Sequence, residues 1–439
     1  MRNIAIKILP MPIKNLLKKV KRRTVDRYKN KQLVKILQSK HQQLLTELHG
    51  KERVRVVFLA IHKSIWKIDP IFQKMLIDPL FEPEILVCPY MVYGEERMLE
   101  DLEQAYSYFL EKGYSVRKSL KKDGSWVKLE EIKPDIVFFT NPYDLTRKEY
   151  YEDAYLNYLS CYVPYYFMAT KHSGEELNQY SNILFLLVWR IYWPHDYCNS
   201  LHKKLLINKG VNGLTLGYPA TERLYLNKGL GLKELWKNQP SSIKKIIYAP
   251  HHTISDSKYS LSSFLMFGEP IKELAKANEG KIQWSFKPHP ILKSKLYAHP
   301  EWGQKRTDAY YDFWDGQPYT QLDEGEYDGL FLSSDAIIHD CSSFIVEYAF
   351  TGKPCLYLVN KNSLKGLLND FGEGVMQVYE QAKSIEEIKM FVCNILNGTI
   401  KTDQNKRAYF DSYVDKYYKE KLPSERIIED IKQSLGADK

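Results

Sequence analysis

The residues with the clearest chemical pattern lie between Ser333 and Val359, in the segment SSDAIIHDCSSFIVEYAFTGKPCLYLV. A short apolar run typical of a buried strand is followed by a polar turn at Asp340 and then by an apolar-faced helix. A helix that begins at the carboxyl end of a parallel strand presents free N–H groups and a positive dipole end to a phosphate. Because Ser342 and Ser343 add hydroxyl donors at the same place, the segment predicts a phosphate-binding turn.

Glu347 lies four residues after Ser343, so the two side chains share one face of the expected helix. A carboxylate in that place is suited to accept both hydroxyls of a nucleotide ribose. The pattern equally allows a structural interpretation, in which Ser342 only caps the helix and Glu347 is an exposed helix residue. The residues alone leave both interpretations open.

A second polar group, KPHP at residues 287–290, ends the expected strand that starts at Gln283. Lys287 and His289 are two residues apart, so both side chains point to one side of an extended chain, and the flanking prolines stop the strand there. Lys287 can offset the charge of a diphosphate, and His289 can donate a proton or a hydrogen bond to a leaving phosphate. A structural role for His289 is the alternative.

A third polar group, YAPHHT at residues 248–253, again follows an expected strand. His251 and His252 are suited to orient a phosphate or a nucleobase. Adjacent histidines on an extended chain face different ways, so this pair alone is a poor metal site. Since all three groups follow strands of one half of the chain, we expect them to converge at one edge of a sheet.

The N-terminal half holds two weaker candidates. TKHSG, residues 170–174, places His172 in a polar turn where a base can meet an acceptor hydroxyl. NPYDLTR, residues 141–147, ends an expected strand with Asp144 and Arg147. Structural roles are the alternative for both segments.

Apolar runs alternate with helical patterns along the chain, which predicts parallel βαβ units and an α/β fold of two Rossmann-like domains. The expected strands are Val54–Ala60, Glu84–Tyr90, Asp135–Asn141, Cys161–Ala169, Lys245–Pro250, Gln283–Pro290, Asp328–Ser333, Asp335–Asp340 and Lys353–Val359. The expected helices are Glu95–Lys112, Ser262–Ala277, Phe344–Gly352, Ile385–Leu396 and Glu425–Leu435. A stretch rich in Gly, Lys and Ser around Pro240 marks a boundary. We therefore expect a basic arm at 1–50, one domain at 51–235, and a second at 241–439 whose last helix can cross back.

Positive charge is concentrated at the N-terminus of this 439-residue chain. Residues 1–50 hold 13 Lys and Arg and two acidic residues, and the other basic and acidic residues nearly balance. Lysines are mixed with Leu16, Leu17 and Val20, as in an interfacial helix that anionic lipid attracts. A helix packed loosely on the body is the alternative. Nucleic acid is not an expected partner, because it requires clustered basic residues on the body.

Three further features of the sequence bear on the cellular compartment of the protein. The most apolar stretch, residues 183–193, contains Arg190 and is shorter than the roughly 20 apolar residues that span a bilayer. Lys7 and Pro10 interrupt the first apolar run, which argues against a secretory signal. The six cysteines form no CxxC pair, so neither a zinc ribbon nor a disulfide framework is indicated. We expect a cytoplasmic protein that is peripheral on the cytoplasmic face of the cell membrane.

The KPHP segment together with SDAIIHDCSSFIVEYAFTGKP resembles the C-terminal half of the CDP-glycerol glycerophosphotransferases, the teichoic-acid polymerase type. That family usually has a strand with K-x-H-P, then S-D-x-x-I-x-D-Y-S-S, and an acidic residue on the following helix. YAPHHT stands where the family has its Y-A-P strand end, and KLPSERIIEDI, residues 421–431, is similar to its closing helix. The likeness is good over about residues 245–431 and weak over 51–235.

The resemblance implies a GT-B arrangement, in which two domains face a cleft. The domain at 51–235 would present the acceptor, and the domain at 241–439 would bind a CDP-polyol, with glycerol the first choice. By position, His289 would contact the donor phosphates and assist the departure of CMP. Ser342 and Ser343 would bind phosphate, and Glu347 would bind the ribose.

Three positions depart from the family's pattern. His172 would correspond to the catalytic base of an N-terminal His-Gly pair, but here Ser173 precedes the glycine. Cys341 stands in place of the usual tyrosine, and Glu347 in place of the usual aspartate, with the same charge on a longer arm.

The implied reaction is in-line attack of an acceptor hydroxyl on the β-phosphorus of the CDP-polyol. It moves polyol phosphate to a cell-surface glycan or lipid-linked acceptor of the cell envelope, such as a teichoic acid or capsule polysaccharide. No cofactor is expected, because such families need no tightly bound metal and no carboxylate cluster in the sequence demands one. The alternatives are a sugar-nucleotide glycosyltransferase or epimerase of the same fold, and a non-catalytic membrane-surface binding protein.

Overall fold

We analysed a computed structural model of the chain. It describes residues 11–171, 180, 182–227, 235–237, 240, 242–254, 261–360, 366–400 and 403–437, with side chains from residue 28 onward. The chain divides into two compact units. Unit 1 comprises Met1–Tyr165, Tyr180–Leu216 and Ser424–Lys439, and unit 2 comprises Tyr166–Gln179 and Gly217–Pro423. Relative to the expected domains, residues 166–179 and 217–235 group with the second unit and the final helix groups with the first.

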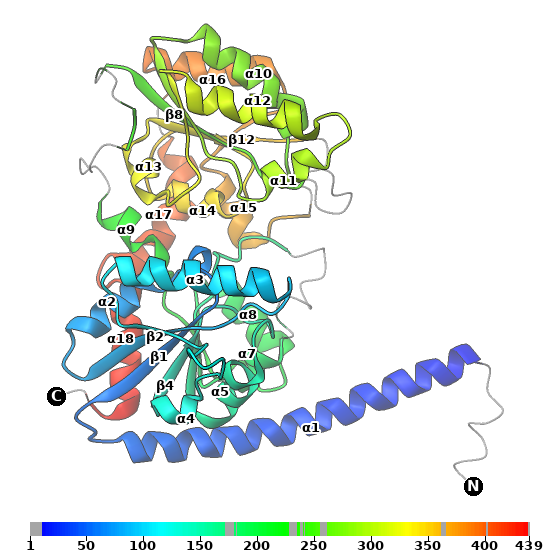
Figure 1. Ribbon diagram of the computed structural model, residues 1–439, viewed down its shortest axis with the longest axis vertical. Coiled ribbons are helices and arrows are strands. Elements are labelled where there is room, and N and C mark those ends of the chain that lie inside the picture. The colour runs from blue at the N-terminus through cyan, green and yellow to red at the C-terminus, as the bar shows by residue number, and fades with distance from the viewer. Residues whose placement is uncertain are drawn as a thin grey trace. The chain divides into compact units, whose positions relative to one another are not determined.

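The core of unit 1 is a seven-stranded parallel sheet in the order β3-β2-β1-β4-β5-β6-β7 (Figure 1). Its strands are β1 Val54–Ala60, β2 Phe81–Val87, β3 Val116–Lys118, β4 Ile136–Phe139, β5 Leu159–Tyr162, β6 Arg190–Trp193 and β7 Gly213–Thr215. Every residue of β4 and β5 is buried. Continuous burial is expected of parallel strands whose two faces are both covered by helices.

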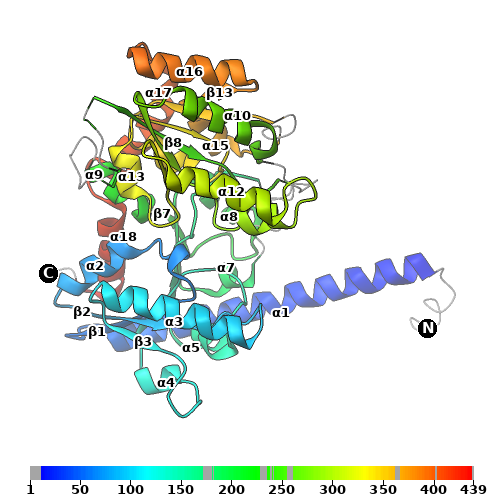
Figure 2. The ribbon, with the colours of Figure 1, turned by 45° about the horizontal axis from the view of Figure 1, so that its top comes forward.

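Helices flank this sheet, and Figure 2 shows α2 and α3 beside the strands β1, β2 and β3. The helices of the unit are α1 Met11–Leu48, α2 Asp69–Ile77, α3 Glu95–Glu111, α4 Leu129–Ile132, α5 Glu152–Asn157, α7 Ile183–Leu187, α8 Asp196–Leu205 and α18 Pro423–Leu435, and two 3-10 turns are η2 Lys63–Ile65 and η3 Lys148–Tyr150. The described side chains of α1 include Val34, Leu37 and Leu48, which are buried, so this part of the basic arm packs on the unit. In the part of the chain that the structure describes, no helix has the length and apolar character to cross a bilayer.

Unit 2 is built on a six-stranded parallel sheet in the order β10-β9-β8-β11-β12-β13. Its strands are β8 Lys244–Ala249, β9 Ile282–Phe286, β10 Thr320–Leu322, β11 Ala336–His339, β12 Cys355–Leu358 and β13 Glu380–Ala382. From β8 the chain adds strands β9 and β10 toward one edge of the sheet, and from β11 it adds β12 and β13 toward the other edge. The strand order therefore reverses between β8 and β11. In open α/β sheets, ligands bind outside the carboxyl ends of the strands at such a reversal.

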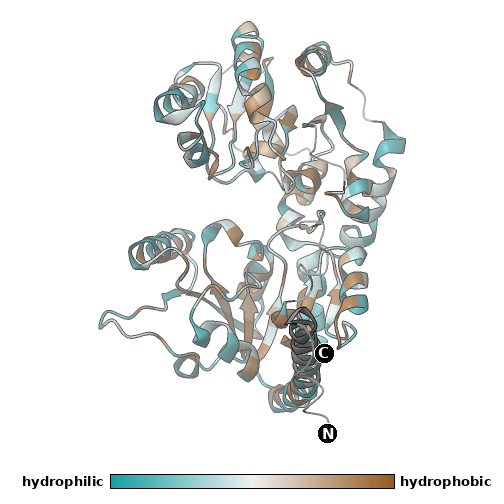
Figure 3. Ribbon diagram, turned by 90° about the vertical axis from the view of Figure 1, so that its right-hand side faces the viewer, coloured by the Kyte–Doolittle hydropathy of each residue, from teal (hydrophilic) through white to brown (hydrophobic). Residues whose placement is uncertain are grey.

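The helices of unit 2 lie on both faces of this sheet, with α10, α12 and α16 on one side and α13, α14 and α15 on the other (Figure 1). They are η5 Pro219–Thr221, α9 Glu222–Leu226, α10 Phe264–Ala277, α11 Leu292–Tyr297, α12 Gly303–Gly316, α13 Asp328–Ser333, α14 Phe344–Ala349, α15 Asp370–Met376, α16 Ile385–Asn397 and α17 Gln404–Tyr418. An aromatic core that includes Trp284, Phe286 and Trp314 fills the space between β9 and α12. Figure 3 shows the hydrophobic residues of each unit concentrated on the strands and on the inner helix faces.

Two strand predictions were wrong. Residues 328–333 form helix α13, in which Leu330 and Phe331 are buried; a short apolar run does not by itself distinguish a strand from a buried helix. The strand expected at 161–169 is β5, which begins at Leu159 and ends at Tyr162. Beyond it, the carbonyl groups of Met168 and Ala169 accept hydrogen bonds from Asn369. The other expected strands are present with ends shifted by up to four residues.

Candidate functional site

The carboxyl ends of β8, β9 and β11 lie side by side in unit 2, and backbone hydrogen bonds join the first two. The N–H of Lys287 donates to the carbonyl of Tyr248 at 2.8 Å, and the N–H of His289 donates to the carbonyl of Pro250 at 3.1 Å. The thiol of Cys341 approaches the carbonyl of Ala249 at 3.4 Å. The structure therefore brings together the three polar groups that the sequence places after these strands.

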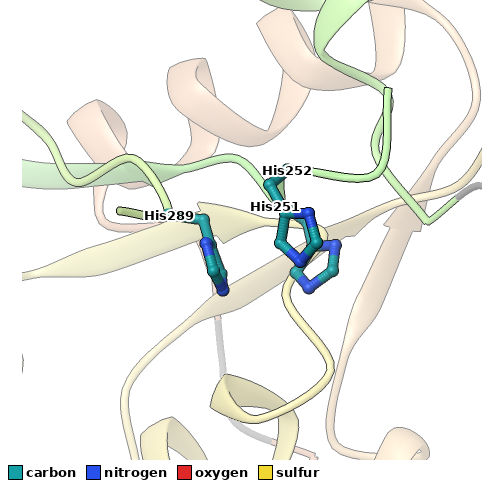
Figure 4. Close-up of side chains that lie close together, drawn as sticks. All are labelled: His251, His252 and His289. Carbon is teal, nitrogen blue, oxygen red and sulfur yellow. The ribbon is translucent and has the colours of Figure 1, made fainter. Parts of the chain in front are cut away.

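Three histidines form a cluster at this edge, with His251 and His252 from the end of β8 and His289 from the segment after β9 (Figure 4). The ring centroids lie 4.3 Å apart for His251 and His252, 5.1 Å for His251 and His289, and 4.1 Å for His252 and His289. The expectation that the adjacent pair faces different ways was wrong, because the extended chain ends at Ala249 and its alternation ends with it.

The imidazoles of His251 and His289 are neutral at pH 7. Burial lowers the pKa of His251 to about 2 and that of His289 to about 3, and the neighbouring histidines lower both pKa values further. Of the two roles expected for His289, a proton donor requires the cationic ring, whereas a hydrogen-bond donor does not. The environment of His289 favours the hydrogen bond.

Lys287 is a buried cation at the same edge, with 5% of its surface exposed. Among the residues that the structure describes, its ammonium group has no ion-pair or hydrogen-bond partner; it lies 6.0 Å from the ring centroid of Tyr327. Burial lowers the pKa of Lys287. Because a buried charge is costly unless it is paired, this ammonium is suited to receive an anion.

The turn after β11 carries the two predicted serines and Glu347. Ser343 precedes α14, a helix of six residues, and its side chain makes no capping hydrogen bond. Glu347 is 3% exposed and accepts a hydrogen bond from the hydroxyl of Tyr327 at 2.5 Å. The alternative in which Glu347 is an exposed helix residue was therefore wrong, and the residue at the cap of α14 is Ser343 rather than Ser342. A ribose contact for Glu347 stays a prediction.

Asp340 is fully buried and ties the turn to two other segments. Its carboxylate accepts hydrogen bonds from the N–H of His251 at 2.5 Å, the N–H of Ser263 at 2.6 Å and the hydroxyl of Ser263 at 2.7 Å. Burial raises the pKa of Asp340 to about 6 although these donors act in the opposite direction. Both oxygens of Asp340 therefore meet protein donors, which hold the His251 turn and the start of α10.

The structure describes only part of the two weaker candidate segments of the N-terminal half. His172 lies outside the described residues. Just before it, the N–H of Lys171 donates to the carbonyl of Leu367 at 2.6 Å. Arg147 forms an ion pair with Glu149 at 2.9 Å and lies over the ring of Trp126, which fits the structural alternative for that segment.

Three residues that shape the site were not predicted from the sequence. Tyr327 lies just before α13, in a region expected to lead into a strand. Ser263 and Thr253 act through hydrogen bonds to Asp340 and to His251, and serine and threonine in loops are too common to single out. The corresponding edge of the sheet in unit 1 holds His62, whose ring packs on Tyr90 with centroids 4.6 Å apart.

The order of strands in the two sheets defines a GT-B-like α/β fold, which solved structures share. The wall teichoic acid polymerase TagF, in two variant forms, superposes with TM-scores of 0.55 and 0.53 at 13% identity, over 94% of this chain and 98% of that one. A UDP-N-acetylglucosamine 2-epimerase superposes with a TM-score of 0.51 at 14% identity, over 88% of this chain and 97% of that one. At these identities the likeness establishes the fold.

The family follows from the sequence. Residues 195–431 match the family described as CDP-glycerol:poly(glycerophosphate) glycerophosphotransferase. The match covers more than half of the chain, and the chain belongs to that family of transferases. No curated protein matches the chain.

Proposed function

We propose that the protein transfers glycerol phosphate from CDP-glycerol to a hydroxyl of a cell-surface glycan or lipid-linked acceptor and releases CMP. The observation that carries the proposal is the buried Lys287 ammonium at the strand-order reversal of unit 2, which forms no ion pair with a described carboxylate, although Asp323 and Glu324 act on its pKa from a longer distance. A donor diphosphate supplies the missing negative charge at the place where α/β sheets bind nucleotides.

The chemical step is in-line attack of the acceptor oxygen on the β-phosphorus. The bond from that phosphorus to the bridging oxygen breaks, and CMP leaves. Since the second pKa of a phosphate monoester is about 6, CMP leaves as a stable anion and needs charge stabilisation more than protonation. Lys287, the N–H groups of the histidine cluster and the hydroxyl of Ser343 supply that stabilisation.

Other residues of the site bind or position. Glu347 binds the ribose hydroxyls, and Tyr327 orients its carboxylate through the 2.5 Å hydrogen bond. Asp340 acts as a positioning residue, because it fixes the backbone of His251. His172 is the proposed base for the acceptor hydroxyl, on the strength of the family's pattern.

The basic arm at residues 1–50 places the enzyme on the cytoplasmic face of the membrane, where a lipid-linked acceptor would be presented. The charge of the arm supports this proposal, since each basic residue near an anionic surface contributes about 1 kcal/mol. Co-sedimentation with vesicles tests it. The full chain should bind vesicles that contain phosphatidylglycerol and release them at high salt, and equal binding to neutral phosphatidylcholine vesicles would refute it.

The donor is tested by CMP release. The purified full chain is incubated with CDP-glycerol, CDP-ribitol, UDP-glucose or UDP-N-acetylglucosamine, each with a lipid-linked glycan. The proposal predicts CMP from CDP-glycerol at the highest rate and no turnover of the UDP-sugars. UDP-sugar turnover without CMP from either CDP-polyol would reject the donor assignment and favour the glycosyltransferase or epimerase alternative.

A further inference from the structure

We propose that His251, His252 and His289 form a binding site for one divalent transition-metal ion, with zinc as the preferred ion. The ligand nitrogens of the three rings lie within 4.8 Å of one another. Figure 4 shows the three rings gathered in one place although they come from two segments that lie far apart in the sequence.

The spacing of the rings is close to that of a metal site. A tetrahedral zinc ion with bonds of 2.0 to 2.1 Å separates its ligand nitrogens by about 3.3 Å. Rotations that move the nitrogens inward by roughly 1 Å therefore suffice. His252 and His289 are only partly buried, so their rings have room for this movement.

The type of the three ligands fits a transition-metal ion. Three nitrogen ligands without a thiolate or carboxylate favour zinc and its neighbours over magnesium or calcium, which prefer oxygen.

A second layer of contacts supports His251 as a ligand. Its Nδ1 atom lies 3.0 Å from the hydroxyl of Thr253, which can accept from an Nδ1–H and so leave Nε2 for the metal. The hydroxyl of Thr253 is itself held by the N–H of Leu261 at 3.0 Å. At His289, the N–H of Ile291 donates to Nδ1 at 3.4 Å. This hydrogen bond is long and weak, so its loss costs little whether Nδ1 or Nε2 of His289 binds the metal.

Three protein ligands leave the fourth position of a tetrahedral ion open, as in catalytic zinc sites. In a second step that rests on the proposed function, this position takes a phosphate oxygen of the donor. The ion would then take over from the N–H groups of the histidine cluster and stabilise the charge on the leaving phosphate beside Lys287.

The test measures metal binding apart from catalysis. The full chain, without a polyhistidine tag, is freed of metal with a chelator and titrated with zinc by calorimetry and with cobalt by visible absorption. His252→Ala and His289→Ala are compared with His49→Ala, which removes an exposed histidine of unit 1. Circular dichroism and melting temperature establish that each variant is folded.

The proposal predicts one zinc per chain, unchanged in His49→Ala and weakened at least about tenfold in each cluster variant. It also predicts that zinc, and not magnesium, raises the melting temperature, and that CDP-glycerol alters the cobalt spectrum. Absence of zinc binding, or equal binding by folded cluster variants, would overturn the metal site. A cobalt spectrum that CDP-glycerol leaves unchanged would overturn the phosphate contact alone. Failure of CMP release with every donor would instead reject the proposed function and leave the zinc result standing.

Discussion

Replacing Lys287 with methionine should lower activity and raise stability at the same time. The side chain is 5% exposed and its ammonium has no described ion-pair partner, so the folded protein without donor bears the cost of a buried charge. Methionine has a similar volume and removes that cost. A hydrogen bond to a charged group contributes about 1.5 to 3 kcal/mol, so losing the contact with the donor diphosphate should reduce kcat/KM by about 10- to 150-fold.

The two effects are measured separately. The melting temperature without nucleotide should rise by about 2–4 °C if the free energy of unfolding increases by about 1 kcal/mol. CMP release from CDP-glycerol gives kcat/KM. Lys281→Met, an exposed lysine of the same unit, is the matched control and should change neither quantity. A Lys287→Met protein that is less stable yet fully active would refute the anion-binding role and show that the lysine is structural.

Three further predictions concern the site and the fold. Glu347→Gln should raise the KM for CDP-glycerol about tenfold with a smaller change in kcat, because only ribose binding is weakened; an unchanged KM would contradict the ribose contact. Asp340→Asn should lower the free energy of unfolding by about 1 to 3 kcal/mol and lower kcat/KM, since a buried acceptor of three hydrogen bonds is lost; normal activity would show that the His251 turn needs no such anchor. His202 is buried with its pKa lowered to about 4 by burial, so its neutral form is the stable one in the folded protein. The contribution of His202 to the free energy of unfolding is complete above pH 6.5 and should fall by about 2 kcal/mol by pH 5. Thermal unfolding at pH 8 and pH 5 should therefore show a smaller loss of stability at the lower pH in His202→Gln than in the unsubstituted protein. An equal loss in both proteins would show that other groups cause it.

The arrangement of the second sheet follows well from the sequence. Apolar runs such as 336–338 are fully buried, and a polar group follows each of them. Both the strands and the strand ends that carry chemistry can therefore be predicted from the sequence pattern. The convergence of Lys287, His289 and Asp340 then follows from parallel strand order.

What the sequence did not predict depends on contacts between distant segments. The helix at 328–333 was predicted as a strand because its short apolar run, Leu330 to Leu332, fits either element. The closeness of the three histidine rings depends on how the chain turns after Ala249, which periodicity does not specify. The anchoring of Asp340 by Ser263 joins residues 77 positions apart.

The central claim is that a donor diphosphate lies at the carboxyl ends of β8, β9 and β11. A crystal structure of the full chain with CDP-glycerol tests it most directly. The account predicts phosphate oxygens within hydrogen-bonding distance of the Lys287 ammonium and the Ser343 hydroxyl, with the ribose at Glu347. A nucleotide bound at full occupancy elsewhere, with the Lys287 ammonium still unpaired, would contradict it.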